Sequence, residues 1–474
     1  MTRQSTLRRS LAVPPVAAGS DGDGSHGMMT RARRRRLSLL AQWRDWANLL
    51  PVDLVEEISG RLLSLDVAEY LRFRAVCSPW RGLTADPRTA GLLHSRFRPR
   101  NWMVLSIIPD AEPHRRLLNL ATAASLGVDP PALSSHCHIC DVYGLLLLYH
   151  KPTTTIRLLD PLTSALTEFP AISSIVPAVP LDHHTVLFKN PLGTIPRAIN
   201  GAAFDDSTSP PTLLLCLRGG LATIIFAKPG DAHWTMVTPG RSTHPRNYQH
   251  QQLLFFTLLS LGGHCYISSP EGSLYLMELQ PLPRLVEVVD QHRFADPDNI
   301  WRERIMSFLV SGTAGRMLMV RYWSGMVERF GGVEAYNPEE LFTARGITSR
   351  IEVLEVDIAG RRLVPVRSLG RYAVFIGLRH CLHISTETFP SISADTIYLG
   401  CHHQQFRGFG IYHINNTKNH PRTEHNDKFV FDISRYLYQP AASPYNLDEY
   451  LVFYVDRRHR YSKACINHTS CLFS

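Results

Sequence analysis

The sequence predicts an α+β multidomain protein in which a small all-α helical module precedes an all-β propeller. Between residues 50 and 81 apolar side chains recur at helical spacing. From residue 101 onward the chain consists of short apolar runs bounded by Gly, Pro, Asp or Ser, which is typical of strands and turns. Groups of these runs recur at intervals of roughly 40 to 60 residues, which favours a propeller over the alternative of paired β-sandwiches.

Residues 1–42 are predicted to form a disordered basic tail. Eight arginines fall within the first 36 residues against only Asp21 and Asp23, so most of the net charge of +9 lies here. The tail has too little apolar material to fold. Its run from Arg31 to Arg36 is interpreted as a nuclear-import signal, a nonspecific polyanion contact or a solvated basic flank. The remaining chain is nearly balanced in charge, so we expect no specific nucleic-acid binding.

The first helix is expected to begin at Pro51, because proline suits the first turn of a helix. A stripe of apolar residues follows at helical spacing, namely Leu54, Ile58, Leu62 and Leu65. Gly60 should weaken this helix by roughly 1 kcal/mol relative to Ala and is a candidate for its end. Asp66 is the expected N-cap of a second helix, and Pro79 is placed to break or bend that helix.

The stretch from Leu50-Pro51 to Val76-Cys77-Ser78-Pro79-Trp80-Arg81 resembles an F-box. The resemblance implies docking on a Skp-type adaptor, which would couple the chain to a cullin-based ubiquitin ligase. Carried over residue by residue, the adaptor contacts or their immediate support are Leu50, Pro51, Leu54, Ile58, Val76 and Trp80. The competing interpretation is that these helices pack only against the next domain.

Strands are predicted in repeating groups after the helices. The clearest group covers residues 143–149, 156–163 and 166–170. Looser groups cover residues 212–217, 222–226 and 234–237, and then 263–268, 273–278 and 285–289. Further groups begin near Arg316 and Tyr372. Each group is expected to form a small antiparallel sheet.

The unit Asp160-Pro161-Leu162-Thr163 with Phe169-Pro170 resembles a blade signature of plant F-box proteins whose C-terminal domain, formerly of unknown function, is a KIB-type β-propeller. Stretches 351–357, 366–370, 373–377 and 395–399 resemble that family's closing blades in order. With these resemblances the chain divides into a disordered basic tail (1–42), an F-box (43–88), a linker (89–100) and a KIB-type β-propeller (101–474).

Catalytic and cofactor motifs are lacking in the sequence: there is no phosphate-binding glycine loop, no Gly-x-Ser-x-Gly and no His-Glu-x-x-His. We therefore expect no enzyme activity, no catalytic residues and no cofactor. The one metal-like cluster is His136-Cys137-His138-Ile139-Cys140. Strand alternation would place His136, His138 and Cys140 on one face, yet packing of an edge strand is the preferred interpretation and no metal site is assigned.

Two functions remain open from the sequence. In the first, the chain is the substrate receptor of a Skp-cullin-F-box ligase, with the propeller binding an unidentified protein substrate. In the second, it is a protein-binding scaffold with a degenerate F-box. No apolar run approaches the roughly 20 residues that a membrane span requires, and nine scattered cysteines indicate reduced thiols. A location in the nucleus, the cytoplasm or both is expected, without membrane partners.

Overall fold

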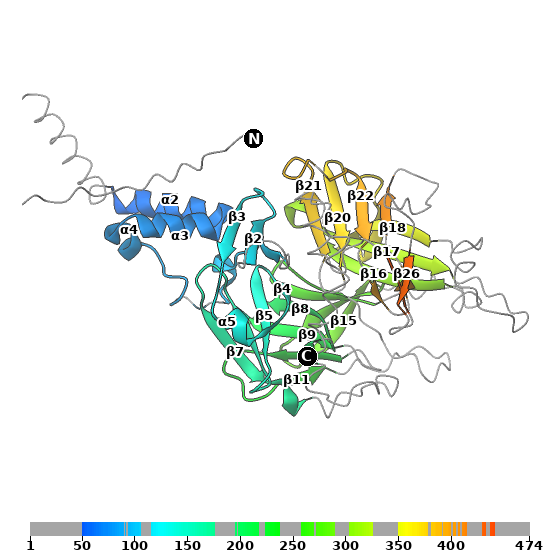
Figure 1. The fold of residues 1–474 in the computed structure, drawn as a ribbon, viewed down its shortest axis with the longest axis horizontal. Coiled ribbons are helices and arrows are strands. Elements are labelled where there is room, and N and C mark those ends of the chain that lie inside the picture. The colour runs from blue at the N-terminus through cyan, green and yellow to red at the C-terminus, as the bar shows by residue number, and fades with distance from the viewer. Residues whose placement is uncertain are drawn as a thin grey trace, which may run out of the picture.

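The protein folds as a short bundle of helices followed by a ring of small β-sheets (Figure 1). The computed structural model describes residues 50–89, 91, 93–105, 115–175, 195–196, 198–217, 223–237, 257–269, 272–289, 303–325, 349–377, 381–390, 392–399, 402–403, 406–407, 410–414, 429–432 and 437–440. The predicted disordered tail lies outside these residues.

Three helices form the N-terminal module: α2 (Val52–Leu65), α3 (Val67–Val76) and α4 (Ser78–Leu83). Asp66 caps α3 as predicted, because its side chain accepts a hydrogen bond from the backbone N–H of Ala68. Pro79 lies in the first turn of α4, so it helps to start a third helix rather than bend the second.

The expectation that the first helix could end at Gly60 is wrong, since α2 continues through this glycine for a further turn. Val55 and Leu63 are buried on either side of Gly60 along the helix. Burying side chains of this size stabilises by about 1.5–3 kcal/mol each, which exceeds the helix cost of about 1 kcal/mol for glycine. Tertiary packing therefore overrides local propensity at this position.

Six sheets of three or four strands follow the helices within the described residues, and we call them blades 1 to 6. Blade 1 contains β1 (Trp102–Leu105), β2 (Arg115–Asn119) and β3 (Ser125–Val128). Blade 2 contains β4 (Cys137–Val142), β5 (Leu145–His150), β6 (Thr155–Leu159) and β7 (Leu166–Ala171). Blade 3 contains β8 (Ile199–Asp205), β9 (Thr212–Leu217), β10 (Thr223–Ala227) and β11 (Thr235–Val237).

Blade 4 contains β12 (Thr257–Leu261), β13 (His264–Ser268), β14 (Leu274–Glu278) and β15 (Arg284–Val289). Blade 5 contains β16 (Glu303–Ser311), β17 (Met317–Gly325), β18 (Ser349–Asp357) and β19 (Arg362–Pro365). Blade 6 contains β20 (Tyr372–Ile376), β21 (Cys381–Ser385), β22 (Thr396–Leu399) and β25 (Gly410–His413). Two-stranded pairs are formed by β23 (His402–His403) with β24 (Phe406–Arg407) and by β26 (Phe429–Asp432) with β27 (Leu437–Pro440).

Buried clusters between neighbouring sheets close the blades into a ring. One hydrophobic cluster joins each successive pair of blades, from blades 1 and 2 through to blades 5 and 6. A further cluster joins blade 6 back to blade 1, with Phe375 of β20 and Leu118 of β2 among its members. Two stacked sheets would share one core, whereas this chain has a separate core at every junction. The prediction of a propeller is confirmed, and the sandwich alternative is excluded.

The predicted strand groups in blades 2, 3 and 4 match the second to fourth strands of each blade. Residues 212–217 coincide with β9, and residues 263–268 and 273–278 match β13 and β14 to within one residue. The first strands of blades 2, 3, 4 and 5 and all three strands of blade 1 were not among the predicted groups. Blade 6 also departs from a simple meander, because its order is β21-β20-β22-β25 and β20 runs parallel to β22.

The Asp160 motif forms the turn between β6 and β7. The Asp160 carboxylate accepts hydrogen bonds from the Leu162 backbone N–H at 2.9 Å and the Thr163 hydroxyl at 2.8 Å. Burial raises the pKa of Asp160, and these hydrogen bonds oppose that rise. Asn119 makes an equivalent turn in blade 1, accepting from the backbone N–H of Ala121 at 2.9 Å. The blade signature is therefore a side-chain-capped turn.

Candidate functional site

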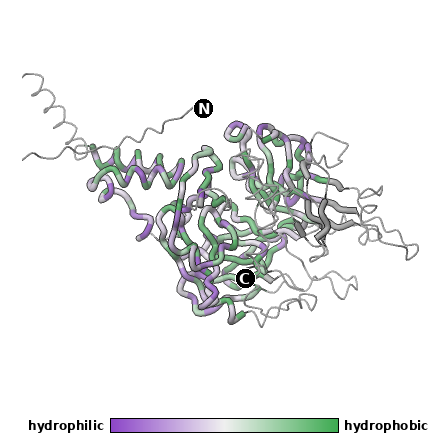
Figure 2. Tube along the Cα trace, in the orientation of Figure 1, coloured by the Kyte–Doolittle hydropathy of each residue, from purple (hydrophilic) through white to green (hydrophobic). Residues whose placement is uncertain are grey.

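The helical module carries an unusual share of the exposed apolar surface. Nine large hydrophobic residues are exposed among the described residues, and six of them lie on α2, α3 and α4: Val52, Leu54, Ile58, Leu65, Val76 and Leu83. Figure 2 shows hydrophobic and hydrophilic residues alternating along these helices. Exposed apolar side chains that gather on one small element indicate a surface for a partner. We call these six exposed residues the apolar helix face; on α2, Leu54, Ile58 and Leu65 share one side of the helix, and Val52 lies at its start.

Local packing explains why this face points outward. Val55, Ser59 and Leu63 form the buried side of α2, one position along from the predicted stripe. The stripe itself is largely solvent-facing, since Leu54 is 44% exposed and Ile58 is 39% exposed. Its apolar side chains are therefore not used by the core of the chain.

The structure places the predicted adaptor residues in three settings. Leu54 and Ile58 on α2 and Val76 at the end of α3 are exposed. Pro51 is exposed at the N-cap of α2, and Leu50 before it is half-buried. Trp80 on α4 is also half-buried, and it packs within the module. The role of these residues in adaptor binding stays a prediction.

Trp80 is held by the module itself. Its ring stacks on that of Phe73 with centroids 4.5 Å apart and an interplanar angle of 14°. Its indole N–H is buried without a hydrogen-bond partner among the described residues. The stacking on Phe73 holds α4 against α3, so Trp80 has a structural role in the module in addition to its partly exposed surface.

The sequence reasoning missed Val52 and Leu83 as members of the apolar helix face. Leu83 ends α4, a helix of six residues that is too short to show a period in the sequence. Val52 precedes the stripe by two positions, so only the helix start at Pro51 could have indicated its exposure.

Arg74 fixes the last helix of the module. Its guanidinium donates to the backbone oxygens of Thr84 and Ala85, the latter at 2.8 Å, and lies 3.2 Å from the Asp86 carboxylate. The Tyr70 hydroxyl donates to the same Ala85 oxygen at 2.7 Å. These contacts tie the segment after α4 to α3. They therefore fix the position of α4, which carries Leu83 of the apolar helix face.

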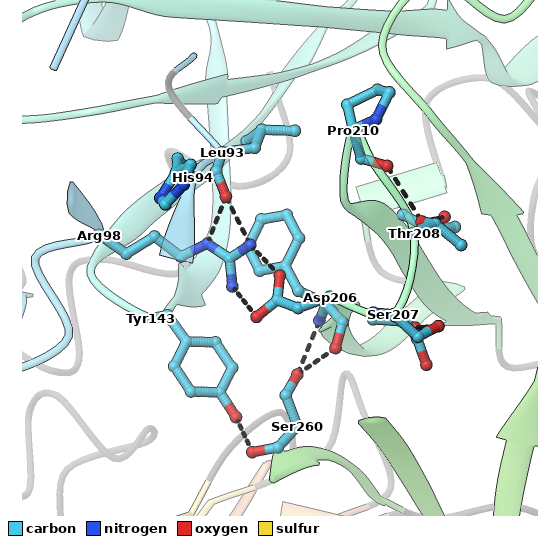
Figure 3. Close-up of polar contacts among 12 residues, drawn as sticks. Leu93, His94, Arg98, Tyr143, Asp206, Ser207, Thr208, Pro210 and Ser260 are labelled. Atoms are coloured by element: carbon cyan, nitrogen blue, oxygen red, sulfur yellow. Dashed lines mark hydrogen bonds and ion pairs between the residues drawn. The ribbon is translucent and has the colours of Figure 1, made fainter. Parts of the chain in front are cut away.

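The segment between the helices and the first blade is anchored in the propeller (Figure 3). Arg98 donates to the Leu93 backbone oxygen and forms a two-point ion pair with Asp206, at 2.5 and 3.1 Å. Its guanidinium also lies over the Phe204 ring, 4.0 Å from the centroid. Leu93 is buried in the cluster between blades 2 and 3. This segment therefore packs against the blades.

The metal-like cluster is not assembled in the structure. A bulge in β4 breaks the alternation that would have placed three donors on one face, so Ile139 and Cys140 are both buried. His138 contacts Asp141 at 2.8 Å, whereas His136 contacts the Ala132 oxygen at 2.7 Å. The predicted common face of His136, His138 and Cys140 is therefore wrong. In the part of the chain that the structure describes, no group of three or more His, Cys, Asp or Glu could hold a metal.

Fold and surface together define the class of protein: a six-bladed β-propeller preceded by helices with an exposed apolar face. The KIB1-4 beta-propeller family model matches residues 99–432, which is well over half of the chain, so the chain belongs to this family. The propeller part of the sequence resemblance is thus confirmed, while the F-box and the plant origin stay predictions. A comparison with curated proteins finds no match. Among the described helices, none is long and apolar enough to cross a membrane.

Proposed function

We propose that the chain is the substrate-receptor subunit of a Skp-cullin-F-box E3 ubiquitin ligase. The helical module would bind a Skp-type adaptor, and the propeller would bind the protein to be ubiquitinated. The observation that carries the proposal is the apolar helix face, which lies on the helices that resemble an F-box. The β-propeller is a domain suited to protein binding, which supports the proposal that it binds the protein substrate.

In this function the chain makes and breaks no bonds, so it is not an enzyme. It raises the effective concentration of substrate lysines near the ligase's ubiquitin-conjugating partner. The receptor would act in the nucleus, the cytoplasm or both. The alternative of a scaffold with a degenerate F-box differs in one measurable property, which is the lack of adaptor binding.

Replacing Leu54 and Ile58 together by Asp is expected to weaken binding of a purified Skp-type adaptor at least about 100-fold, because two charges would be buried against an apolar partner. Both side chains are exposed, so the fold should be kept. Binding is measured by titration calorimetry on the full chain. Trp80→Ala is a poorer test, since the loss of stacking on Phe73 would loosen the module.

Leu282→Asp is the matched control, because Leu282 is 73% exposed in the turn between β14 and β15 of the propeller. The control should bind the adaptor as the unmodified chain does. A folded chain that does not bind the adaptor would leave the scaffold as the better description. Equal binding by the double variant would place the adaptor contact elsewhere.

A further inference from the structure

We infer that Asp66 is a positioning residue that locks the helical module onto the propeller, so that the apolar helix face is presented at a fixed orientation. The inference deepens the proposed function and rests on it for its biological meaning. The positioning role of Asp66 itself concerns the chain without a bound adaptor. The observations that carry it are the three hydrogen bonds of one carboxylate and the packing around them.

The Asp66 carboxylate joins the helices to two residues of blade 1. Its Oδ1 accepts from the indole N–H of Trp102 at 2.8 Å, and its Oδ2 accepts from the side-chain amide of Asn119 at 2.8 Å. The same Oδ1 accepts from the Ala68 backbone N–H at 3.0 Å as the N-cap of α3. Hydrogen bonds to an ionised acceptor are the stronger kind. A single side chain therefore starts a helix and fastens it to the propeller.

The two donors are rigid parts of the blade. Trp102 in β1 is 3% exposed and Asn119 at the end of β2 is 1% exposed. The Asn119 side-chain oxygen is itself engaged by the backbone N–H groups of Ala121 and Thr122. Rotation of the Asn119 amide group would break these two hydrogen bonds, so its N–H group stays directed at Asp66.

Apolar contacts also join α3 to blade 1 and to the connecting segment. Ala68 of α3 belongs to the buried cluster that contains Trp102 and Leu117 of blade 1. Tyr70 of α3 shares a second cluster with Phe97 of the connecting segment. Figure 1 shows α2 and α3 beside the blade that carries β2 and β3. The two donors, Trp102 and Asn119, are buried, and a low local dielectric strengthens the hydrogen bonds that they donate.

Two further contacts fasten the segment that follows α4 to the blades. The Arg88 guanidinium donates to the Thr163 backbone oxygen in the β6–β7 turn, at 3.3 Å. The connecting segment is fastened by Arg98 to Asp206 of blade 3 (Figure 3). These contacts hold the segment that follows α4 on blades 2 and 3, whereas the polar contacts of the helices with blade 1 are made by Asp66.

The apolar helix face does not take part in this docking. Its members are exposed, while the docked side of the helices consists of buried residues such as Val67 and Ala68. An adaptor bound to the exposed side would leave the Asp66 contacts intact. The propeller would then be held at a constant distance and angle from the adaptor, as transfer of ubiquitin to a bound substrate requires.

The test measures the distance between spin labels on noncanonical amino acids at Glu56 of α2 and Ala232 of blade 3, both exposed. The unmodified free chain should give one narrow distance distribution. Trp102→Phe removes one donor to Asp66. Asp66→Asn keeps an oxygen for the N-cap while losing the acceptor for the side-chain amide of Asn119. Both variants should lose the narrow peak and give a broad distribution.

Trp234→Phe is the matched control, because Trp234 is also buried and its indole N–H donates to the Pro170 oxygen inside the propeller at 2.9 Å. This variant loses an equivalent hydrogen bond away from the junction and should keep the narrow peak. A narrow peak in Trp102→Phe and Asp66→Asn would overturn the inference. Equal broadening in Trp234→Phe would also overturn it, by showing general loosening.

Adaptor affinity is measured on the same variants and is expected to be unchanged, because the apolar helix face is untouched. Loss of adaptor affinity in Trp102→Phe, without loss in Trp234→Phe, would contradict the separation of the two faces. A chain that shows the narrow peak but never binds an adaptor would refute the proposed function and leave the positioning role standing. The two failures are therefore distinguishable.

Discussion

Asp206→Ala is expected to lower the free energy of unfolding by about 3–5 kcal/mol, the usual loss when one partner of a buried ion pair is removed. The side chain of Arg98 is 1% exposed, and Asp206 is its only carboxylate partner among the described residues. Burial lowers the pKa of Arg98, whereas Asp206 opposes that shift. Without Asp206 the guanidinium charge would stay buried with only the Leu93 oxygen and the Phe204 ring beside it. Urea unfolding of the full chain measures the loss.

Glu387→Ala provides the comparison for this prediction. Glu387 pairs with Arg371 at 2.8 Å, but both side chains are largely exposed. Exposed ion pairs contribute about 0–1 kcal/mol, so this variant should unfold almost as the unmodified chain does. Similar losses in the two variants would mean that burial of Arg98 does not govern the strength of its ion pair.

Gly144→Ala is expected to destabilise the chain by at least about 3 kcal/mol, because two costs add at this glycine. Gly144 has a φ of +79°, which an L side chain rarely adopts. A Cβ atom here would also overlap the backbone carbonyl oxygen of Pro99, so the connecting segment would have to shift. Thermal and urea unfolding of the variant should show the loss.

Gly230→Ala separates the two costs. Gly230 has a φ of +89°, yet no atom lies within 4 Å of the position that a Cβ atom would occupy there. It should therefore lose only the conformational part, about 1–2 kcal/mol. If Gly144→Ala lost no more than Gly230→Ala, the close approach of the connecting segment to blade 2 would be refuted.

The second to fourth strands of blades 2 to 4 and the helix starts could be predicted because their signals are local. β9 is an almost continuous apolar run between turn residues, and Asp66 is a typical N-cap before a helix. The Asp160 turn was recognisable for the same reason, since its capping residue and proline lie next to each other. In each case the residues that determine the structure are neighbours in the sequence.

The first strands of blades 3 and 4 gave a weak local signal because some of their small and polar residues contact the neighbouring blade. β8 contains Gly201, Ala202 and Ala203, which carry little strand propensity. Ser260 in β12 exchanges two hydrogen bonds with the backbone of Phe204 in β8, at 2.6 and 2.8 Å. Small and polar residues at these positions serve contacts between blades, so they weaken the local strand signal.

The candidate site could be predicted in part. The stripe of Leu54 and Ile58 was visible from its helical spacing, but spacing alone does not say whether a stripe faces the core or a partner. In the structure Val55 and Leu63 form the buried side of α2, so the stripe of Leu54 and Ile58 faces outward. The junction at Asp66 was recognised only as a cap, because its donors Trp102 and Asn119 lie far along the chain.

The most direct test of the central claim is amide hydrogen exchange of the full chain with and without a purified Skp-type adaptor. If the apolar helix face is the adaptor site, exchange should slow in peptides covering residues 51–66 and 76–83, and the blades should exchange unchanged. Protection confined to the blades, or no protection in a folded chain at saturating adaptor, would contradict the claim.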